Sequence, residues 1–167
     1  MPDLSECALQ LSGTVARHEP TSDNWKRLTE ILGAHYVNGL MTILYVDRDR
    51  SLVQRVYTSN AKDYSIGGTK QLMGSKWARQ VIDEGRCLIA STPEEMEAAF
   101  ADHQILSALG CTKAMNIPLR QGINITWTVN LLRGNDDYTF AECEAVKEQI
   151  QAWFHELYPG SNLPQRT

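Results

Sequence analysis

Thiols are the side chains of this sequence best suited to covalent chemistry. The chain holds four cysteines, which are widely separated: Cys7, Cys87, Cys111 and Cys143. A thiolate can attack an oxidised sulfur and then form a disulfide, which is the chemistry of a cysteine-based reductase. No two of the four form a Cys-x-x-Cys pair, and a free cysteine also serves as a small apolar core residue. The spacing therefore favours reduced structural thiols, as expected in a cytoplasmic protein.

His103 is the candidate for proton transfer. It follows Asp102 at a predicted helix start, and a general base must lie within hydrogen-bond reach of the proton that it takes. The sequence shows no second catalytic partner for this ring, which favours a surface or capping role. With Cys87 and Cys111, His103 has the right ligand types for zinc, but no two of these residues are closely spaced. We therefore predict no metal site.

A larger group of residues has the composition of a small-molecule pocket, in which apolar walls carry a few orienting polar groups. The predicted ligand-binding residues are Tyr57, Tyr64, Trp77, Phe100, His103, Cys111, Met115, Asn116, Thr128 and Asn130. Each apolar member also fits a place in the core. Asn116 and Asn130 lie in two neighbouring predicted strands, and a buried amide without a hydrogen bond costs roughly 1–3 kcal/mol. A ligand or a buried water would satisfy both amides.

The elements that must position these residues begin with two predicted helices. Apolar residues at three- and four-residue steps indicate the first helix over residues 3–17. The second helix begins at Thr21 or Ser22 and ends at Gly33. Its predicted apolar face carries Trp25, Leu28, Ile31 and Leu32.

A strand pair and a loop follow. Residues 39–47 and 52–59 have the pattern of two strands joined by a polar turn, which predicts a hairpin. Residues 60–70 are predicted to form a loop. No Lys-Ser/Thr follows its Gly67-Gly68 pair at the spacing of a phosphate-binding loop, and no strand-to-helix junction surrounds the pair.

The middle of the chain predicts three short helices and a strand. Ser75 caps a helix over residues 76–84, and residues 87–90 form a short strand. Thr92, with proline after it and glutamate three residues on, has the pattern of a capping box. Asp102 begins the third helix, which Gly110 ends.

The C-terminal third predicts a hairpin and a long helix. The strands cover residues 112–119 and 123–132. Thr139 caps the final helix, whose predicted apolar stripe contains Phe140, Cys143, Val146, Ile150, Trp153 or Phe154, and Leu157. Strands that arrive as hairpins favour an antiparallel sheet in an α+β fold. The terminal helices should then cover one face, and the short middle helices the other.

Two strand segments resemble the corresponding strands of GAF domains. They are Asn116-Ile117-Pro118-Leu119 and Thr128-Val129-Asn130-Leu131-Leu132, which lie on either side of a tight turn. The resemblance covers about residues 20–158 of a single domain that spans 1–167. It implies a cavity between the sheet and the segment formed by the Gly67-Gly68 loop and the 93–110 helices. Trp127 departs from the small residue of many relatives, so its ring is a candidate to fill or reshape this cavity.

The resemblance does not identify a cofactor, which stays unknown. Cys111 precedes a strand, unlike the cysteine of bilin-binding GAF domains, and the motif of the cyclic-nucleotide branch is absent. GAF proteins that reduce methionine sulfoxide carry a Gly-x-Cys-Gly segment, whereas the equivalent stretch here is Gly74-Ser75-Lys76-Trp77. We therefore predict a small-molecule sensor or regulatory domain without its own output domain. The alternatives are a small-metabolite enzyme, such as a reductase using Cys87 or Cys111 with His103, and a protein-interaction scaffold.

Composition narrows the partners. The net charge of −4 and the scattered basic residues argue against a nucleic-acid partner. No apolar run approaches the roughly 18 residues of a membrane span, and the N-terminus lacks the pattern of a signal peptide. We expect a cytoplasmic protein that binds a small organic ligand. The apolar stripes of the 3–17 helix and the final helix predict a homodimer through these two elements.

Overall fold

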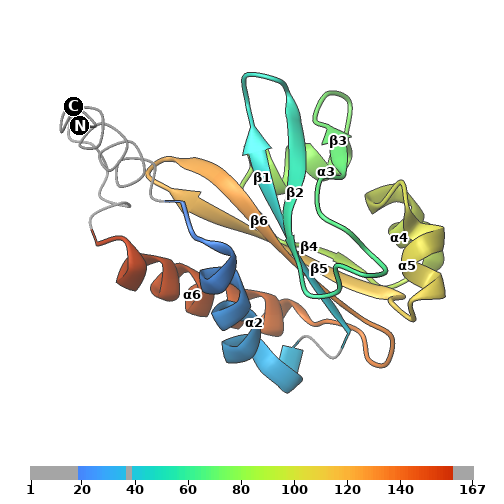
Figure 1. Ribbon diagram of the computed structural model, residues 1–167. Helices are drawn as coiled ribbons and strands as arrows, with labels where there is room; N and C mark the ends of the chain where they lie inside the picture. The colour runs from blue at the N-terminus through green and yellow to red at the C-terminus, as the bar shows by residue number, and fades with distance from the viewer. Residues whose placement is uncertain (1–18, 37–38, 160–167) are drawn as a thin grey trace, which may run out of the picture.

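A six-stranded antiparallel sheet forms the centre of the computed structural model, which describes residues 19–36 and 39–159 (Figure 1). The strands are β1 (Leu40–Asp47), β2 (Leu52–Thr58), β3 (Thr69–Gln71), β4 (Leu88–Ala90), β5 (Lys113–Gln121) and β6 (Asn124–Arg133). Their order across the sheet is β3-β2-β1-β6-β5-β4. Both predicted hairpins are confirmed, and β6 pairs with β1 to join them.

Strand β3 differs from the prediction, because the first two of its three residues lie in the predicted loop over residues 60–70. It is a three-residue edge strand of sequence Thr-Lys-Gln, which has no apolar alternation. Its pairing with β2 comes entirely from the tertiary structure, with Lys70 opposite Val53. Just before β3, the Arg55 amide donates to the Gly68 carbonyl at 2.8 Å, and the Gly67 amide donates to the Arg55 carbonyl at 2.8 Å.

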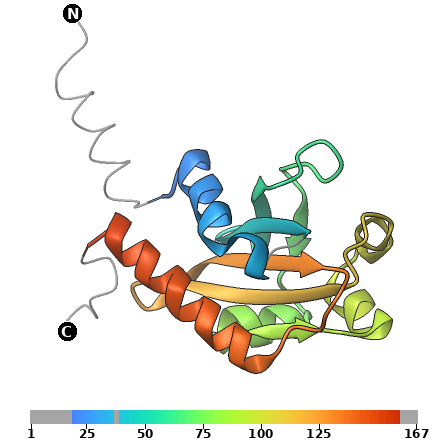
Figure 2. The same cartoon turned by 90° about the horizontal axis from the view of Figure 1, so that it is seen from below.

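Helices α2 (Ser22–Tyr36) and α6 (Phe140–Leu157) lie together on one face of the sheet. Figure 2 shows α6 running along the long strands, with α2 beside it. The side chains of Thr21 and Thr139 cap the two helices as predicted. The core on this face joins Trp25 of α2 to Trp127 of β6, at 6.1 Å between ring centroids, and to Trp153 of α6, at 5.4 Å. Helix α2 continues to Tyr36 beyond its predicted end, although its geometry breaks at Gly33 (φ 38°).

Two residues that were predicted on the apolar faces of these helices are exposed. Ile31 is 53% exposed and Phe140 is 70% exposed, so both assignments were wrong. At 100° per residue, each lies about 90° from the centre of the stripe that its buried neighbours define. A three- or four-residue step from one buried residue is therefore too loose a criterion at the margin of a helix face.

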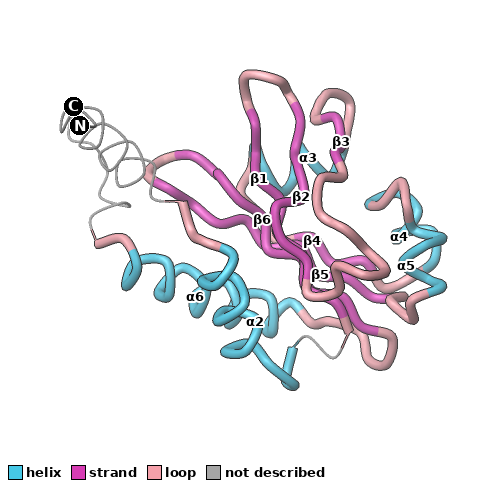
Figure 3. The backbone as a smooth tube through the Cα atoms, in the orientation of Figure 1, coloured by secondary structure: helices cyan, strands magenta, loops and turns pink. Residues whose placement is uncertain are grey.

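Three short helices lie on the other side of the sheet: α3 (Lys76–Ala78), which continues into the π-helical segment η1 (Arg79–Asp83), α4 (Pro93–Ala99) and α5 (His103–Ala108). In Figure 3 the sheet separates α4 and α5 from the pair α2 and α6. The predicted caps of Ser75 and Thr92 are confirmed, including both hydrogen bonds of the Thr92 capping box. The α+β architecture with helices on both faces is therefore confirmed.

The predicted helix over residues 3–17 lies outside the described residues. The stripe of α6 is buried against the sheet of its own chain, where Cys143, Val146, Ile150 and Phe154 are at most 1% exposed. This burial accounts for the stripe without a second subunit. None of the described helices has the length and apolar character needed to cross a membrane.

Candidate functional site

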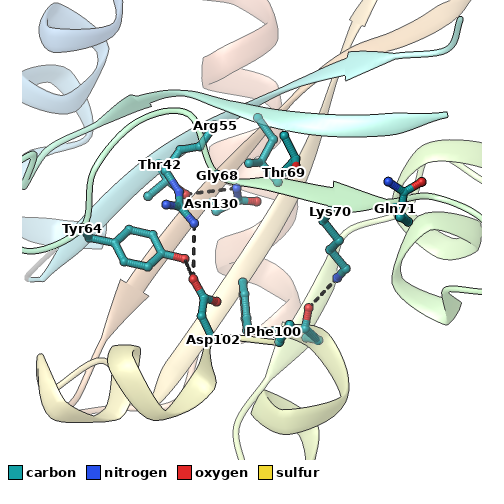
Figure 4. Close-up of a pocket in the computed structure, with 13 residues that line it drawn as sticks. Thr42, Arg55, Tyr64, Gly68, Thr69, Lys70, Gln71, Phe100, Asp102 and Asn130 are labelled. Carbon is teal, nitrogen blue, oxygen red and sulfur yellow. Dashed lines mark hydrogen bonds and ion pairs between the residues drawn. The ribbon is translucent and has the colours of Figure 1, made fainter. Parts of the chain in front are cut away.

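A cavity of about 420 Å³ lies between the sheet and the turn that joins α4 to α5 (Figure 4). Its lining comes from β1, β2, β3 and β6, from the loop before β3, and from residues 99–102. This is the position that the resemblance to GAF domains implies. Figure 4 shows side chains from these separate segments turned toward one another.

A polar row crosses the sheet beneath the cavity, and two of its members, Thr42 and Asn130, line the cavity floor. Thr58, Thr42, Asn130 and Asn116 pair in register across β2, β1, β6 and β5, so their side chains share one face. All four are buried. One apolar cluster containing Leu40 lies on one side of this row, and another containing Val46 lies on the other side. The row therefore separates two apolar clusters of the core on this face, and the cavity floor between them is polar.

The Asn130 amide is satisfied by its neighbours. Its nitrogen donates to the Thr42 hydroxyl at 3.2 Å, and its oxygen accepts from the Thr128 hydroxyl at 3.2 Å. Asn116 is satisfied only in part, because its oxygen accepts from the Trp77 indole N–H while its buried Nδ2 has no hydrogen-bond partner among the described residues. Both asparagines therefore point into the interior, as the prediction required, and one keeps a free donor.

Asp102 is the centre of a second group of contacts. Its carboxylate accepts from the Tyr64 hydroxyl at 2.5 Å and forms an ion pair with the Arg55 guanidinium at 3.3 Å. The guanidinium also stacks on the Tyr64 ring, 3.6 Å from its centroid, and donates to the Ser65 carbonyl at 2.8 Å. Burial, together with the bond to Asp102, raises the pKa of Tyr64 above its ordinary value of 10.0. These contacts hold the start of α5 against β2 and the loop that follows it.

Sequence reasoning identified Asp102 as a helix cap and did not select Arg55. Asp102 does occupy the cap position of α5, but its side chain makes no capping hydrogen bond. Its carboxylate turns instead to Tyr64, a residue 38 positions earlier in the chain. Nothing local in the sequence distinguishes this use of an aspartate from the common capping role.

Lys70 forms the wall at β3. Its ammonium donates to the Ala99 carbonyl at 2.6 Å and lies 4.3 Å from the centroid of the Trp77 ring. Burial lowers the pKa of Lys70 to about 8, although the charge of Asp102 acts in the opposite direction. The sequence does not single out Lys70, because the three-residue strand that carries it has no apolar alternation.

Of the ten predicted ligand-binding residues, the structure places Tyr64, Phe100 and Asn130 on the cavity wall. Thr128, Asn116 and Trp77 form the layer next to it and connect to the floor through hydrogen bonds or register. These six residues are brought together.

The other four lie elsewhere. Tyr57 and Met115 pack in the core under α2 and α6, on the opposite face of the sheet. Cys111 is buried with Leu106 of α5, and the His103 ring nitrogen Nδ1 lies 3.1 Å from the Phe100 carbonyl. Trp127 also lies under α2 and α6, 5.5 Å from Phe154 between ring centroids, so its ring does not enter the cavity.

The thiols are divided between the two faces of the sheet. Cys87 and Cys143 share the core under α6, where a hydrogen bond between them lowers the pKa of Cys87 and raises that of Cys143. Cys111 lies in the cluster on the cavity side, and burial raises its pKa. Cys87 is therefore not brought together with Cys111 and His103. Within residues 19–36 and 39–159, no group of three or more His, Cys, Asp or Glu side chains has the arrangement of a metal site.

No family model matches the sequence, and no curated protein matches it significantly. Solved structures do match the fold. The GAF domain of a two-component sensor histidine kinase from Bacillus halodurans has a TM-score of 0.62 at 14% identity, covering 83% of this chain and 95% of that one. The GAF domain/HD domain protein from Geobacter sulfurreducens has a TM-score of 0.67 at 9% identity, covering 86% and 95%.

A third similar structure is NreA from Staphylococcus aureus, mutated in its nitrate binding site. Its TM-score is 0.54 at 16% identity, with coverage of 78% of this chain and 96% of that one. At these identities the likenesses establish the arrangement of the elements.

Proposed function

From the GAF fold of this chain, we propose that it is a sensor or regulatory domain that binds a small organic molecule in the cavity between the sheet and the α4–α5 turn. The observation that carries the proposal is the cavity, which has a volume of about 420 Å³ and a floor of ordered polar side chains. Binding cavities for small molecules typically have volumes of about 300–1,000 Å³ and place a few polar groups among apolar walls. Leu44 and Phe100 supply such walls here.

The position of the cavity suits a sensor because its walls belong to separate segments. A molecule held between Asn130 of β6 and Phe100 after α4 would contact the sheet and the helical turn at once. Binding would then bias how tightly α4 and α5 pack on the sheet, since a ligand stabilises the arrangement to which it binds better.

Native mass spectrometry of freshly purified protein, followed by denaturation to release any bound molecule, is the direct test. A second test blocks the cavity. Ala101 is exposed and lines it, so Ala101→Trp can place an indole in the space without opening the core. Ala108→Trp, at an exposed position of α5 outside the lining, is the matched control. We expect the bound molecule to be lost in Ala101→Trp and kept in Ala108→Trp.

The proposal fails under a clear result. It is wrong if two results are found together. The wild type carries no bound molecule, and every compound of a metabolite screen changes the melting temperature of the wild type and of Ala101→Trp equally. Nitrate is included as an inorganic comparison, because NreA is described with a nitrate binding site, and a response to nitrate alone would contradict an organic ligand.

Homodimerisation through the terminal helices stays a separate prediction. The apolar stripe of α6 is buried within its own chain, so the homodimer prediction now depends on residues 3–17. Sedimentation of the full chain at micromolar concentration tests it, and a monomer would contradict it.

A further inference from the structure

The charged side chains that line the cavity carry one more positive charge than negative charge. They are Arg55, Lys70 and Asp102. Arg55 and Asp102 form an ion pair at 3.3 Å, and the Tyr64 hydroxyl supports the same carboxylate oxygen. Lys70 has no ion-pair partner among the residues that the structure describes. The cavity therefore carries one positive charge more than its walls neutralise.

The surroundings of Lys70 make that charge costly. The side chain points inward from β3, opposite the fully buried Val53. Its ammonium has three N–H donors, and the protein supplies the Ala99 carbonyl and the face of the Trp77 ring as neutral partners. A partly buried cation without a counter-charge is unfavourable, and an anion placed beside it removes the penalty.

We propose that the ligand of this cavity is a small organic monoanion, a carboxylate, whose charged group pairs with the Lys70 ammonium while its apolar body lies against Leu44 and Phe100. The inference rests on the proposed binding function and specifies its ligand. The excess charge of one selects a monoanion, because a phosphate dianion would leave a buried negative charge. The volume of about 420 Å³ selects an organic molecule, since a three- or four-atom inorganic ion would leave most of the cavity empty.

Two structural roles of Lys70 make a different prediction. Ala99 is the last residue of α4, so the ammonium stands at the negative end of a helix dipole. An inward-pointing lysine on a short edge strand also discourages pairing with another chain. Either role makes Lys70 important for stability or solubility, but neither makes the cavity distinguish an acid from its amide.

The experiment therefore measures that distinction with isosteric pairs: benzoate against benzamide, and 4-methylpentanoate against 4-methylpentanamide. Calorimetry at pH 7 compares the wild type, Lys70→Met and, as control, Lys62→Met at an exposed position outside the cavity lining. We expect at least one acid to bind the wild type and Lys62→Met about tenfold or more tightly than its amide, which is the scale of a charge-assisted contact. Lys70→Met should lose this preference.

A pH series on the wild type covers the case in which Lys70→Met fails to fold. Between pH 7 and pH 9 the acid should lose roughly tenfold in affinity as Lys70 loses its proton, while binding of the amide stays constant. Equal binding of acid and amide, or an acid preference that survives in Lys70→Met, overturns the carboxylate inference and leaves the proposed function intact. The same holds if native mass spectrometry releases a neutral or cationic molecule. Both the carboxylate inference and the proposed function are overturned if the wild type carries no bound molecule and its thermal stability responds to every compound as that of Ala101→Trp does.

Discussion

The hydroxyl of Tyr64 lies 2.5 Å from the carboxylate of Asp102, and this single contact ties the loop after β2 to the first turn of α5. Because the same carboxylate oxygen also meets the Arg55 guanidinium, one acidic group organises a corner of the cavity. The corner brings together Tyr64, Arg55 and Asp102, and no local sequence pattern links these three residues.

Removal of the Tyr64 hydroxyl should therefore weaken the fold. We expect Tyr64→Phe to lower the free energy of unfolding by about 1.5 kcal/mol. This is the low end for a hydrogen bond to a charged group, because Asp102 is partly exposed. Urea unfolding measures the loss. Tyr57→Phe, which removes a hydroxyl bonded to Thr29 on the other face, is the matched control and should leave ligand binding unchanged. A wild-type stability for Tyr64→Phe would show that water replaces the contact at no cost.

Arg55→Lys should be destabilising although it conserves charge. The planar guanidinium bonds the Ser65 carbonyl, pairs with Asp102 and stacks on the Tyr64 ring, whereas an ammonium cannot keep all three contacts. We expect a loss of roughly 1–3 kcal/mol in urea unfolding. Arg50→Lys is the control, since Arg50 is 65% exposed and pairs with Asp47 at 3.7 Å, so its loss should stay below about 0.5 kcal/mol. Equal effects of the two substitutions would mean that charge alone matters at Arg55.

The Trp77–Asn116 hydrogen bond gives a prediction about non-additivity. Trp77→Phe leaves the buried Asn116 oxygen without its donor, beside an Nδ2 that already has no partner. We expect a cost of about 1–3 kcal/mol for the lost bond, in addition to the lost ring volume. In the double variant Trp77→Phe/Asn116→Leu both polar partners are gone, so it should be more stable than Trp77→Phe alone. Thermal unfolding of the four proteins of this cycle measures the coupling, and strict additivity would contradict a direct bond.

Stability should depend on pH through Lys70. Burial lowers the pKa of Lys70 to about 8 in the folded chain, from an ordinary value of 10.5. Between these values the unfolded chain binds more protons than the folded chain, so the contribution of Lys70 to stability rises with pH. The stability of ligand-free wild type relative to Lys70→Met should therefore increase from pH 7.5 to pH 9.5. This difference cancels the titration of the other groups, and a constant difference would indicate an unperturbed ammonium.

Cys111 should resist modification in the folded protein. The side chain is buried, and burial raises its pKa, so less thiolate is present than for a free cysteine at any pH. Iodoacetamide at pH 8, followed by peptide mapping, should label Cys111 only after the addition of urea. Rapid labelling of Cys111 in the native protein would instead support the thiol chemistry of the enzyme alternative.

The elements of this fold other than β3 could be predicted from the sequence because each has a local signal. The Thr92 capping box, the Ser75 and Thr139 caps and the two hairpins appear where hydrogen bonds between near neighbours require particular side chains. The antiparallel α+β class follows from their order. The burial of Ile31 and Phe140 was predicted wrongly. Both lie at the margin of a helix face, where burial depends on what packs against the helix.

The site was predictable in part for the same reason. The sequence places Asn116 and Asn130 in the two strands of one hairpin, and the register of the structure then sets them opposite one another on one face. Arg55, Lys70 and Asp102 do not, because their roles depend on contacts across 47, 29 and 38 residues of chain. Sequence alone therefore determined the two hairpins, the capped helices, the antiparallel α+β class and the strands that carry Asn116 and Asn130, all set by near neighbours and strand pairing. Only the tertiary structure decided which charges neutralise each other and that Lys70 is left unpaired, because ion pairs depend on distances in space that no spacing along the chain records.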